Sequence, residues 1–458
     1  MTTSSIGARL DRLPVASFHR RLFALVGVGM FFDGFDIYLA GSVLGATLNS
    51  GFSTLAQNGL FVSVTFIGMM TGALISGFVG DRFGRRVSYQ INLAVFGVAA
   101  FLSAVAPSME VLIGLRFLMG LGLGAEAVVG YSLISEFVPP AQRGRWSGLI
   151  ATIVTSGLPV SALLAFLLVP SFGWRIMFVL GGLGALFAWW LRRGLPESPR
   201  WLEAVGRRDE AEALLGAIEA EVSGGKPLPP PAASVPHTSP SWSLTKLAQA
   251  PLLSRMIVGC VSLVTVNMLI YGFITFLPSF LVKQGHSVFA SFGYVLVMSL
   301  GGPLGSAIGA FSADRFGRKR TIILAAAAAA CFGTSFAFTT DTLMLSLVGF
   351  LLTVPIYVLV ALMFGIYVPE LFPTEIRLRA VGICNTVGRS ASIVVPLIVV
   401  PVFAAHGLAG VLAVMVLALL AMMLVVAGLG IEPERKSLEE LAAPDAPRTI
   451  VEGPVVSG

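Results

Sequence analysis

The sequence predicts an all-α membrane protein with twelve transmembrane helices, arranged as two six-helix bundles related by an internal duplication. The first observation is composition, because 56% of the 458 residues are hydrophobic and only 12% are charged, which is far more apolar than a soluble chain. The second is the repeated occurrence of apolar stretches about 20 residues long, the length that crosses a bilayer core of about 30 Å. The third is a pair of motifs that recurs at nearly one spacing.

Short polar segments separate the twelve expected spans. Their approximate ranges are 22–48, 58–79, 89–107, 109–134, 146–169, 174–194, 253–281, 289–312, 321–339, 342–367, 380–404 and 407–430. The polar start of the chain leads into an apolar run that is too long for a signal peptide, so we expect the first span to stay in the mature protein.

The basic residues predict the orientation. Apart from Arg116, Arg175, Lys283 and Arg389, the 30 Lys and Arg residues all lie in the even-numbered connections, at the span ends that adjoin them, or in the two tails. That side is therefore expected to face the cytoplasm, with both termini there and the chain in the cell (inner) membrane. The net charge of +6 then reflects membrane topology, and no nucleic-acid partner is expected.

Two motif pairs indicate the duplication. "GDRFGRR" at 80–86 recurs as "ADRFGRK" at 313–319, and "SEFVPPAQRGR" at 135–145 recurs as "PELFPTEIRLR" at 369–379. The expected organisation is an N-terminal tail (1–21), a first bundle (22–195), a cytoplasmic linker (196–251), a second bundle (252–431) and a C-terminal tail (432–458). Within the linker, apolar residues at helical spacing from Ala211 to Val222 predict an amphipathic helix, and the proline-rich stretch 223–241 predicts a flexible segment.

The two sets of six spans, the paired loop motifs and "RFLMGLGLGAE" at 116–126 together resemble the major facilitator superfamily. The resemblance covers nearly the whole chain. It implies two six-helix bundles that rock about a site at the membrane midplane and expose it to each side in turn.

The charged loops are expected to bias this rocking rather than to bind substrate, because their ion pairs can form in only one of the two exposed states. The alternative is a solvated basic loop that only fixes topology. The gating candidates are Gly77, Asp81, Arg82, Gly84, Arg85, Arg86, Arg116, Glu136, Arg145, Asp314, Arg315, Arg318, Glu370 and Arg379.

Five ionisable groups are expected inside the membrane, namely Asp33, Asp36, Arg116, Glu126 and Arg389. Each costs about 2.5–3.5 kcal/mol at a helix centre, so each requires a partner, a cavity or a function. Asp33 and Asp36 lie three residues apart on one helix face, where two carboxylates resist joint ionisation. We expect proton coupling there, although one of them could only accept a hydrogen bond. Glu126 is either a further proton site or the partner of Arg116.

Arg389 offers a fork that binds a carboxylate through two hydrogen bonds, which suggests an anionic substrate. The alternative is an internal ion pair with an aspartate of the first span. Tyr38, Asn267, Tyr271 and Asn385 are candidate cavity-lining groups, although each could instead bond between helices.

The pattern "DGFD" in the first span, with an arginine in the eleventh, resembles the aromatic acid:proton and metabolite:proton symporter branches. By that resemblance the two aspartates couple to protons and Arg389 contacts a small organic acid. "PESPRWL" and "PERKSLEEL" also resemble sugar porters, but the paired glutamines of a sugar porter's seventh helix are absent. Proton-coupled uptake of an organic anion is the leading expectation, followed by sugar or polyol uptake, then by a drug:proton antiporter or a non-transporting sensor.

We expect no enzyme, since no histidine or cysteine lies in a nucleophile or metal-ligand pattern. Cys260, Cys331 and Cys384 lie in separate spans and predict neither a disulfide nor a metal site. Protons are the expected coupling ion, no other cofactor is expected, and we expect a monomer.

Overall fold

The computed structural model describes residues 6–231, 249–339, 341–372 and 376–432. This part of the chain is almost entirely helical and contains no strand. The first half contains α1 (Ile6–Asp11), α2 (Ser17–Asn49), α3 (Leu55–Phe83), α4 (Arg85–Ala104), α5 (Met109–Phe137), α6 (Pro140–Phe172), α7 (Arg175–Leu191), the 3-10 turn η1 (Arg192–Gly194), α8 (Pro199–Ala204) and α9 (Arg208–Ser223).

The second half has the same kind of long helices, two of which are interrupted by π-helical segments. It contains α10 (Leu252–Met268), the π-helix Leu269–Ile274, α11 (Leu277–Lys283), α12 (Val288–Ser299), α13 (Gly301–Phe316), α14 (Arg318–Ala337), α15 (Thr342–Val360), the π-helix Ala361–Tyr367, α16 (Val368–Glu370) and α17 (Arg377–Leu429).

Eleven helical units in the described chain are long and apolar enough to cross a membrane. The last of them, α17, is 53 residues long, which would make a straight helix about 80 Å in length. Gly407 interrupts it with φ 65° and ψ −162°, a conformation that glycine adopts without a steric penalty. The expected spans 380–404 and 407–430 are therefore the two parts of α17, and the helical units correspond to the twelve predicted spans.

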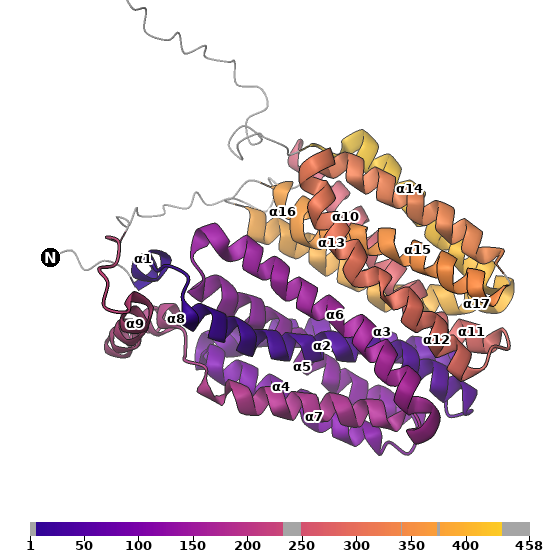
Figure 1. Cartoon of the computed structure of the whole chain (residues 1–458), viewed down its shortest axis with the longest axis horizontal. Helices are drawn as coiled ribbons and strands as arrows, with labels where there is room; N and C mark the ends of the chain where they lie inside the picture. The colour runs from indigo at the N-terminus through magenta and orange to yellow at the C-terminus, as the bar shows by residue number, and fades with distance from the viewer. Residues whose placement is uncertain (1–5, 232–248, 340, 373–375, 433–458) are drawn as a thin grey trace, which may run out of the picture.

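Two groups of helices, α2–α7 and α10–α17, lie side by side and approach each other closely at the end that carries α11 and α12 (Figure 1). We call this the α11 end, and the opposite end, which carries α8 and α9, the α9 end. At the α11 end, Gly45 of α2 packs against Pro278, where a Cβ atom would lie 2.9 Å from the proline Cβ. Ser63 of α3 donates a hydrogen bond to the Ile393 carbonyl at 2.7 Å. Small residues thus permit close backbone contact between the halves.

Close helix packing inside the first bundle fixes α5 against α3 and α2 against α6. Gly124 of α5 lies so near the Met69 carbonyl of α3 that a methyl group there would collide with it, and Gly34 of α2 meets the Val154 carbonyl of α6 in the same way. Neither glycine can be replaced without a backbone shift. This packing sets the positions of the charged side chains that α2 and α5 carry.

The short helices α1, α8 and α9 cover the α9 end of the first bundle (Figure 1). The predicted amphipathic helix is confirmed as α9, whose buried residues are Ala211, Leu215, Ile218 and Val222. Arg9 of α1 binds Glu219 of α9 through two nitrogens, at 3.1 and 2.6 Å. Most of the predicted flexible segment lies outside the described residues.

Candidate functional site

The first feature of the site is a buried ion pair between α2 and α5. Asp36 Oδ2 lies 2.6 Å from Arg116 Nη1, and the two side chains are 0% and 1% exposed. Arg116 Nε also donates to Thr65 Oγ1 at 3.3 Å, and its guanidinium lies 4.8 Å from the centre of the Phe61 ring. An arginine fork and a carboxylate satisfy each other in this way where water cannot reach them.

A second buried ion pair joins α5 to the end of α7. Glu126 Oε1 pairs with Arg192 Nη1, and the side chains are 1% and 0% exposed. Arg192 also donates to the backbone carbonyls of Leu25 at 2.9 Å and Val26 at 2.6 Å. Gly29 makes room for this guanidinium, since a Cβ atom at position 29 would collide with it. Arg192 therefore ties α2, α5 and α7 together.

Asp33 lies in the middle of α2 and, unlike Asp36 and Glu126, is not bound to an arginine. Its side chain is 5% exposed, and its Oδ2 atom is buried without a hydrogen-bond partner. No ion pair joins it to any residue of the described ranges, although it lies within electrostatic range of Glu126, Arg192 and Asp36. Of the three buried acids in the described part of the first bundle, two are thus in ion pairs and one is not.

Arg389 lies near the middle of the first part of α17, on the side of the second bundle that faces the first. It is partly buried, and within the described chain it makes neither a hydrogen bond nor an ion pair. Its charge is within electrostatic range of Tyr131 from α5 and Tyr271 from the π-helix 269–274. Phe66 of α3 packs edge-on against Tyr271, with ring centres 4.3 Å apart. A cation without a partner in the described chain is therefore within electrostatic range of tyrosines from both halves.

The other predicted cavity residues lie around this position. Tyr38 lines a narrow crevice between the halves together with Ser42, Ser161 and Thr275. Its hydroxyl is within electrostatic range of that of Tyr271. Hydroxyl groups from α2 and α6 thus face the π-helical part of the second bundle.

Of the two predicted asparagines, only Asn267 connects two helices. Its Oδ1 accepts a hydrogen bond from Ser392 at 3.1 Å, while its Nδ2 donates to the Leu263 carbonyl. Asn385 is partly buried, and its Nδ2 donates to the Val381 carbonyl within its own helix. The π-helix that carries Tyr271 begins two residues after Asn267, and π-helical turns are frequent at functional sites.

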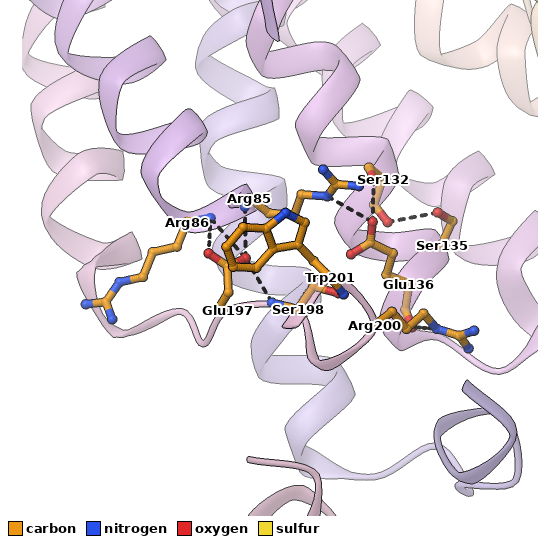
Figure 2. A network of polar contacts seen from close by, with 9 residues as sticks. All are labelled: Arg85, Arg86, Ser132, Ser135, Glu136, Glu197, Ser198, Arg200 and Trp201. Carbon is orange, nitrogen blue, oxygen red and sulfur yellow. Dashed lines mark hydrogen bonds and ion pairs between the residues drawn. The ribbon is translucent and has the colours of Figure 1, made fainter. Parts of the chain in front are cut away.

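The loop motifs form a network at the α9 end of the first half (Figure 2). Arg85 Nε lies 3.1 Å from Glu136 Oε1, as expected. Glu197, from the "PESPR" segment, accepts hydrogen bonds from the backbone N–H groups of Arg85 and Arg86, and a carboxylate at this helix N-terminus is stabilising. Arg200 donates to the Glu136 carbonyl at 2.9 Å.

The second half repeats this arrangement. Arg318 Nε lies 3.1 Å from Glu370 Oε2, as expected. Glu432 accepts hydrogen bonds from the backbone N–H groups of Arg318 and Lys319 at 2.8 and 2.9 Å. Glu197 and Glu432 therefore play the same part at the starts of α4 and α14, which extends the sequence duplication to the residues that end each half.

Comparison with known proteins identifies the class. A family model described as "Sugar (and other) transporter" matches residues 22–443. The inner membrane metabolite transport protein YdjE of Escherichia coli is 34% identical over 95% of this chain and 98% of its own length. The chain belongs to this transporter family, within the major facilitator superfamily. The expectation that it is a transporter and not an enzyme is confirmed.

Two further matches are a relative of similar length and a solved structure. The niacin transporter NiaP of Acinetobacter baylyi is 34% identical over 95% of this chain and 99% of its own length. The xylose transporter XylE from E. coli, in a partially occluded inward open conformation, superposes with a TM-score of 0.71 at 16% identity and covers 92% of this chain and 100% of its own. The second likeness confirms the fold of the transporter.

Four other predicted gating residues of the transporter lie at its surface. Arg82, Arg145, Arg315 and Arg379 are exposed. Gly84 links α3 to α4 with φ 95°, so this glycine allows the chain to change direction as well as the helices to pack closely. Three predicted residues fall outside those described at side-chain level: Gly77, Asp81 and Asp314.

Two predictions about buried charge in the transporter need correction. Arg116 does not pair with Glu126, because it reaches Asp36 and Glu126 reaches Arg192. Arg192 was also missing from the predicted buried groups. It lies at the very end of the predicted sixth span, 174–194, next to Arg193, so it reads as one of the loop cations. Its only sequence signal is a small residue in the neighbouring helix, Gly29, and that signal has meaning only once α2 and α7 are known to be adjacent.

Proposed function

We propose that the transporter takes up a small organic anion, an aromatic carboxylic acid or a close relative, together with protons. The observation that carries this proposal is Arg389, which lies in a membrane-spanning helix and has no ion-pair partner among the described residues. A guanidinium at membrane depth without a counter-ion is costly, and a bound carboxylate would supply two hydrogen bonds and the missing negative charge.

Aromatic neighbours support a flat ring next to that carboxylate. Tyr131 of the first half and Tyr271 of the second are both within electrostatic range of Arg389, and Phe66 is already in edge-on contact with Tyr271. Aromatic side chains favour such edge-on and offset contacts with a ring. The similarity to a niacin transporter points the same way, because niacin is an aromatic carboxylic acid.

The orientation follows from the basic residues and makes this conformation inward-facing. The positive-inside rule puts the α9 end in the cytoplasm, so the α11 end, where the halves touch, is the outer side. Phe166 of α6 and Phe289 of α12, with ring centres 4.6 Å apart, belong to this closed outer side. At the α9 end, the Arg85–Glu136 and Arg318–Glu370 pairs each stay within one half.

A transport cycle then follows from the charges. Outside, the anion binds Arg389 and a proton enters the acidic side of the cavity, which lowers the net charge that must cross the membrane interior. The halves rock about the site, the outer contacts form and the cytoplasmic side opens. The proton and the anion are then released into the cytoplasmic water. The ion pairs at the loop motifs bias which side is open.

The proposal is tested by uptake into proteoliposomes that contain the purified full chain. An inward proton gradient should drive accumulation of labelled nicotinate or benzoate, and unlabelled aromatic acids should compete better than aliphatic acids. Competition by neutral sugars or polyols instead would support the alternative substrate class. Uptake no greater than in empty vesicles for every acid and sugar would contradict a transport function.

Arg389 provides the decisive variant. We expect Arg389→Gln to abolish acid uptake, and Arg389→Lys to recover only part of it, because an ammonium group keeps the charge but loses the planar fork. Thr334→Ala is the control, since Thr334 of α14 is exposed and its hydroxyl donates to the Ala330 carbonyl of its own helix. Full acid uptake by Arg389→Gln would rule out a carboxylate site there.

A further inference from the structure

Two of the three cysteines, which belong to different spans, are in contact in the folded chain. Cys260 lies in α10 and Cys384 in the first part of α17, and their Sγ atoms are 3.8 Å apart. The third, Cys331, is exposed on α14. The spacing of 124 positions along the chain gives no sign of this contact, because the contact depends on the packing of α10 against α17.

Close approach of the two helices brings the sulfur atoms together. A Cβ atom on Gly259 of α10 would lie 2.8 Å from Cys384 Sγ, and one on Gly388 of α17 would lie 3.0 Å from Asn267 Nδ2 of α10. The hydrogen bond between Ser392 and Asn267 joins the same two helices further along. Small residues permit such close contact between helix backbones, so the thiols meet at a tightly packed seam.

The two thiols differ in their access to small reagents. Cys260 is partly exposed, whereas Cys384 is 0% exposed. Cys384 Sγ also lies 4.0 Å from the Met256 carbonyl oxygen of α10, so it lies against that helix beside the Cys260 sulfur. A reachable thiol with a second thiol directly next to it is the arrangement found in redox-sensitive cysteine pairs, where the second thiol resolves the first oxidation product.

The depth of the pair limits which oxidant can act on it. Cys260 lies eight residues after Leu252, where α10 begins, and Cys384 lies seven residues after Arg377, where α17 begins. At 1.5 Å per residue both sulfur atoms are about 10–12 Å along their helices. In the orientation proposed above, both helices begin at the cytoplasmic side, where thiols are normally kept reduced. A small uncharged oxidant suits this depth better than a charged reagent.

We propose that Cys260 and Cys384 form a redox-sensitive modification site that hydrogen peroxide, or another oxidant of the peroxide class, closes to a disulfide. The Cys260 thiolate attacks one peroxide oxygen, the O–O bond breaks, and a sulfenic acid and one water form. The Cys384 thiolate then attacks the sulfenic sulfur, so that the S–S bond forms, the S–O bond breaks and a second water leaves. Two thiols thus lose two electrons and two protons to one peroxide.

The disulfide would act on the proposed acid site through the two helices that it joins. Arg389 lies five residues after Cys384 in α17, and the π-helix that carries Tyr271 begins nine residues after Cys260. A covalent bond between α10 and α17 would restrict the adjustments that these groups make as the acid binds and leaves. This consequence rests on the proposed function, and we expect the oxidised transporter to lose acid uptake until the disulfide is reduced.

The first experiment tests the chemistry without any substrate. The purified full chain in lipid is treated with hydrogen peroxide, digested without a reductant and analysed by mass spectrometry. We expect a linked pair of peptides that contain Cys260 and Cys384, lighter by two hydrogens than the free pair and separated by dithiothreitol. Exposed Cys331 is the internal control for exposure to the oxidant. Oxidation of Cys331 with the other two cysteines left as free thiols, or their overoxidation without a link, overturns the proposal.

The second experiment measures uptake of labelled nicotinate by proteoliposomes that contain the Cys331→Ser chain. Peroxide should abolish uptake and dithiothreitol should restore it, which separates the disulfide from methionine oxidation, since a sulfoxide needs its own reductases. Cys260→Ser and Cys384→Ala, each in the same background, should keep transporting after peroxide. Equal inhibition of these variants, or full uptake by the chain whose link is complete, overturns the effect on transport. If the untreated chain carries no acid, the proposed function fails, and the mass spectrum still decides whether the disulfide forms.

Discussion

Asp36 Oδ2 and Arg116 Nη1 lie 2.6 Å apart in a place that solvent does not reach. The pair joins the middle of α2 to α5, and each residue neutralises the charge of the other. Removal of one partner from such a pair costs about 3–5 kcal/mol, whereas replacement of both is often close to neutral.

We therefore predict that Arg116→Met lowers thermal stability in detergent more than the double variant Asp36→Asn/Arg116→Met does. The reason is that the single variant leaves a buried carboxylate without its cation. Differential scanning fluorimetry of the purified full chain measures the difference. A double variant that is less stable than either single variant would show that the pair is a net source of stability.

Gly29 is predicted to be intolerant of even one methyl group. A Cβ atom there would collide with the Arg192 guanidinium, which has no free space because it bonds to Glu126 and to two carbonyls. Gly29→Ala should cost about 1–3 kcal/mol, as overpacking of a buried site does. The measurement is the melting temperature and the yield of monodisperse protein.

Gly114→Ala is the matched control, because nothing lies within 4 Å of a Cβ atom at that helical position. It should be neutral or stabilising by about 0.4–1 kcal/mol. Equal effects at positions 29 and 114 would remove the argument that Gly29 makes room for Arg192.

Phe166 and Phe289 offer a test of the conformational change. Their rings contact each other across the two halves, with centres 4.6 Å apart, and this contact must separate when the α11 end opens. In a chain that lacks the three native cysteines, a short bifunctional thiol reagent should bridge Phe166→Cys and Phe289→Cys. Uptake should then fall to the level of empty vesicles, and each single cysteine variant should keep transporting after the same treatment. Undiminished uptake by the fully bridged protein would mean that this contact does not open.

Glu219 predicts a pH dependence for the covering helices. Burial raises the pKa of its carboxyl, but hydrogen bonds from Arg9 and Arg12 outweigh this and hold the pKa below its ordinary value of 4.5. Since the pKa is lower in the folded state, the stabilisation is present above the unfolded value and is lost as the pH falls through the folded value. Glu219→Gln should thus lower the melting temperature at neutral pH and have little effect under strongly acidic conditions.

Glu221→Gln is the control for this prediction, because Glu221 pairs with Arg21 at a more exposed position, where the side chains are 36% and 64% exposed. Exposed pairs contribute about 0–1 kcal/mol. A Glu219 effect that is the same at neutral and acidic pH would contradict an origin in its ion pairs.

Much of this architecture was predictable because it depends on local composition. Apolar length defines the spans, and the predicted ranges agree with the helices to within several residues, including the change of direction at Gly407 inside α17. The repeated motifs predicted the Arg85–Glu136 and Arg318–Glu370 pairs, because the duplication placed the same residue types at the same positions of both halves.

The sequence by itself determined that five charged residues must lie at membrane depth, since their helices are too apolar to place them elsewhere. Only the tertiary structure decided how they pair. Arg192 looked like a loop cation, and it becomes a buried partner of Glu126 because Gly29 leaves a space that only the packing of α2 against α7 reveals. The packing of the bundle likewise pairs Arg116 with Asp36 and leaves Asp33 without an ion pair among the described residues. Pairing depends on distances between helices, and the spacing of residues along one helix does not determine those distances.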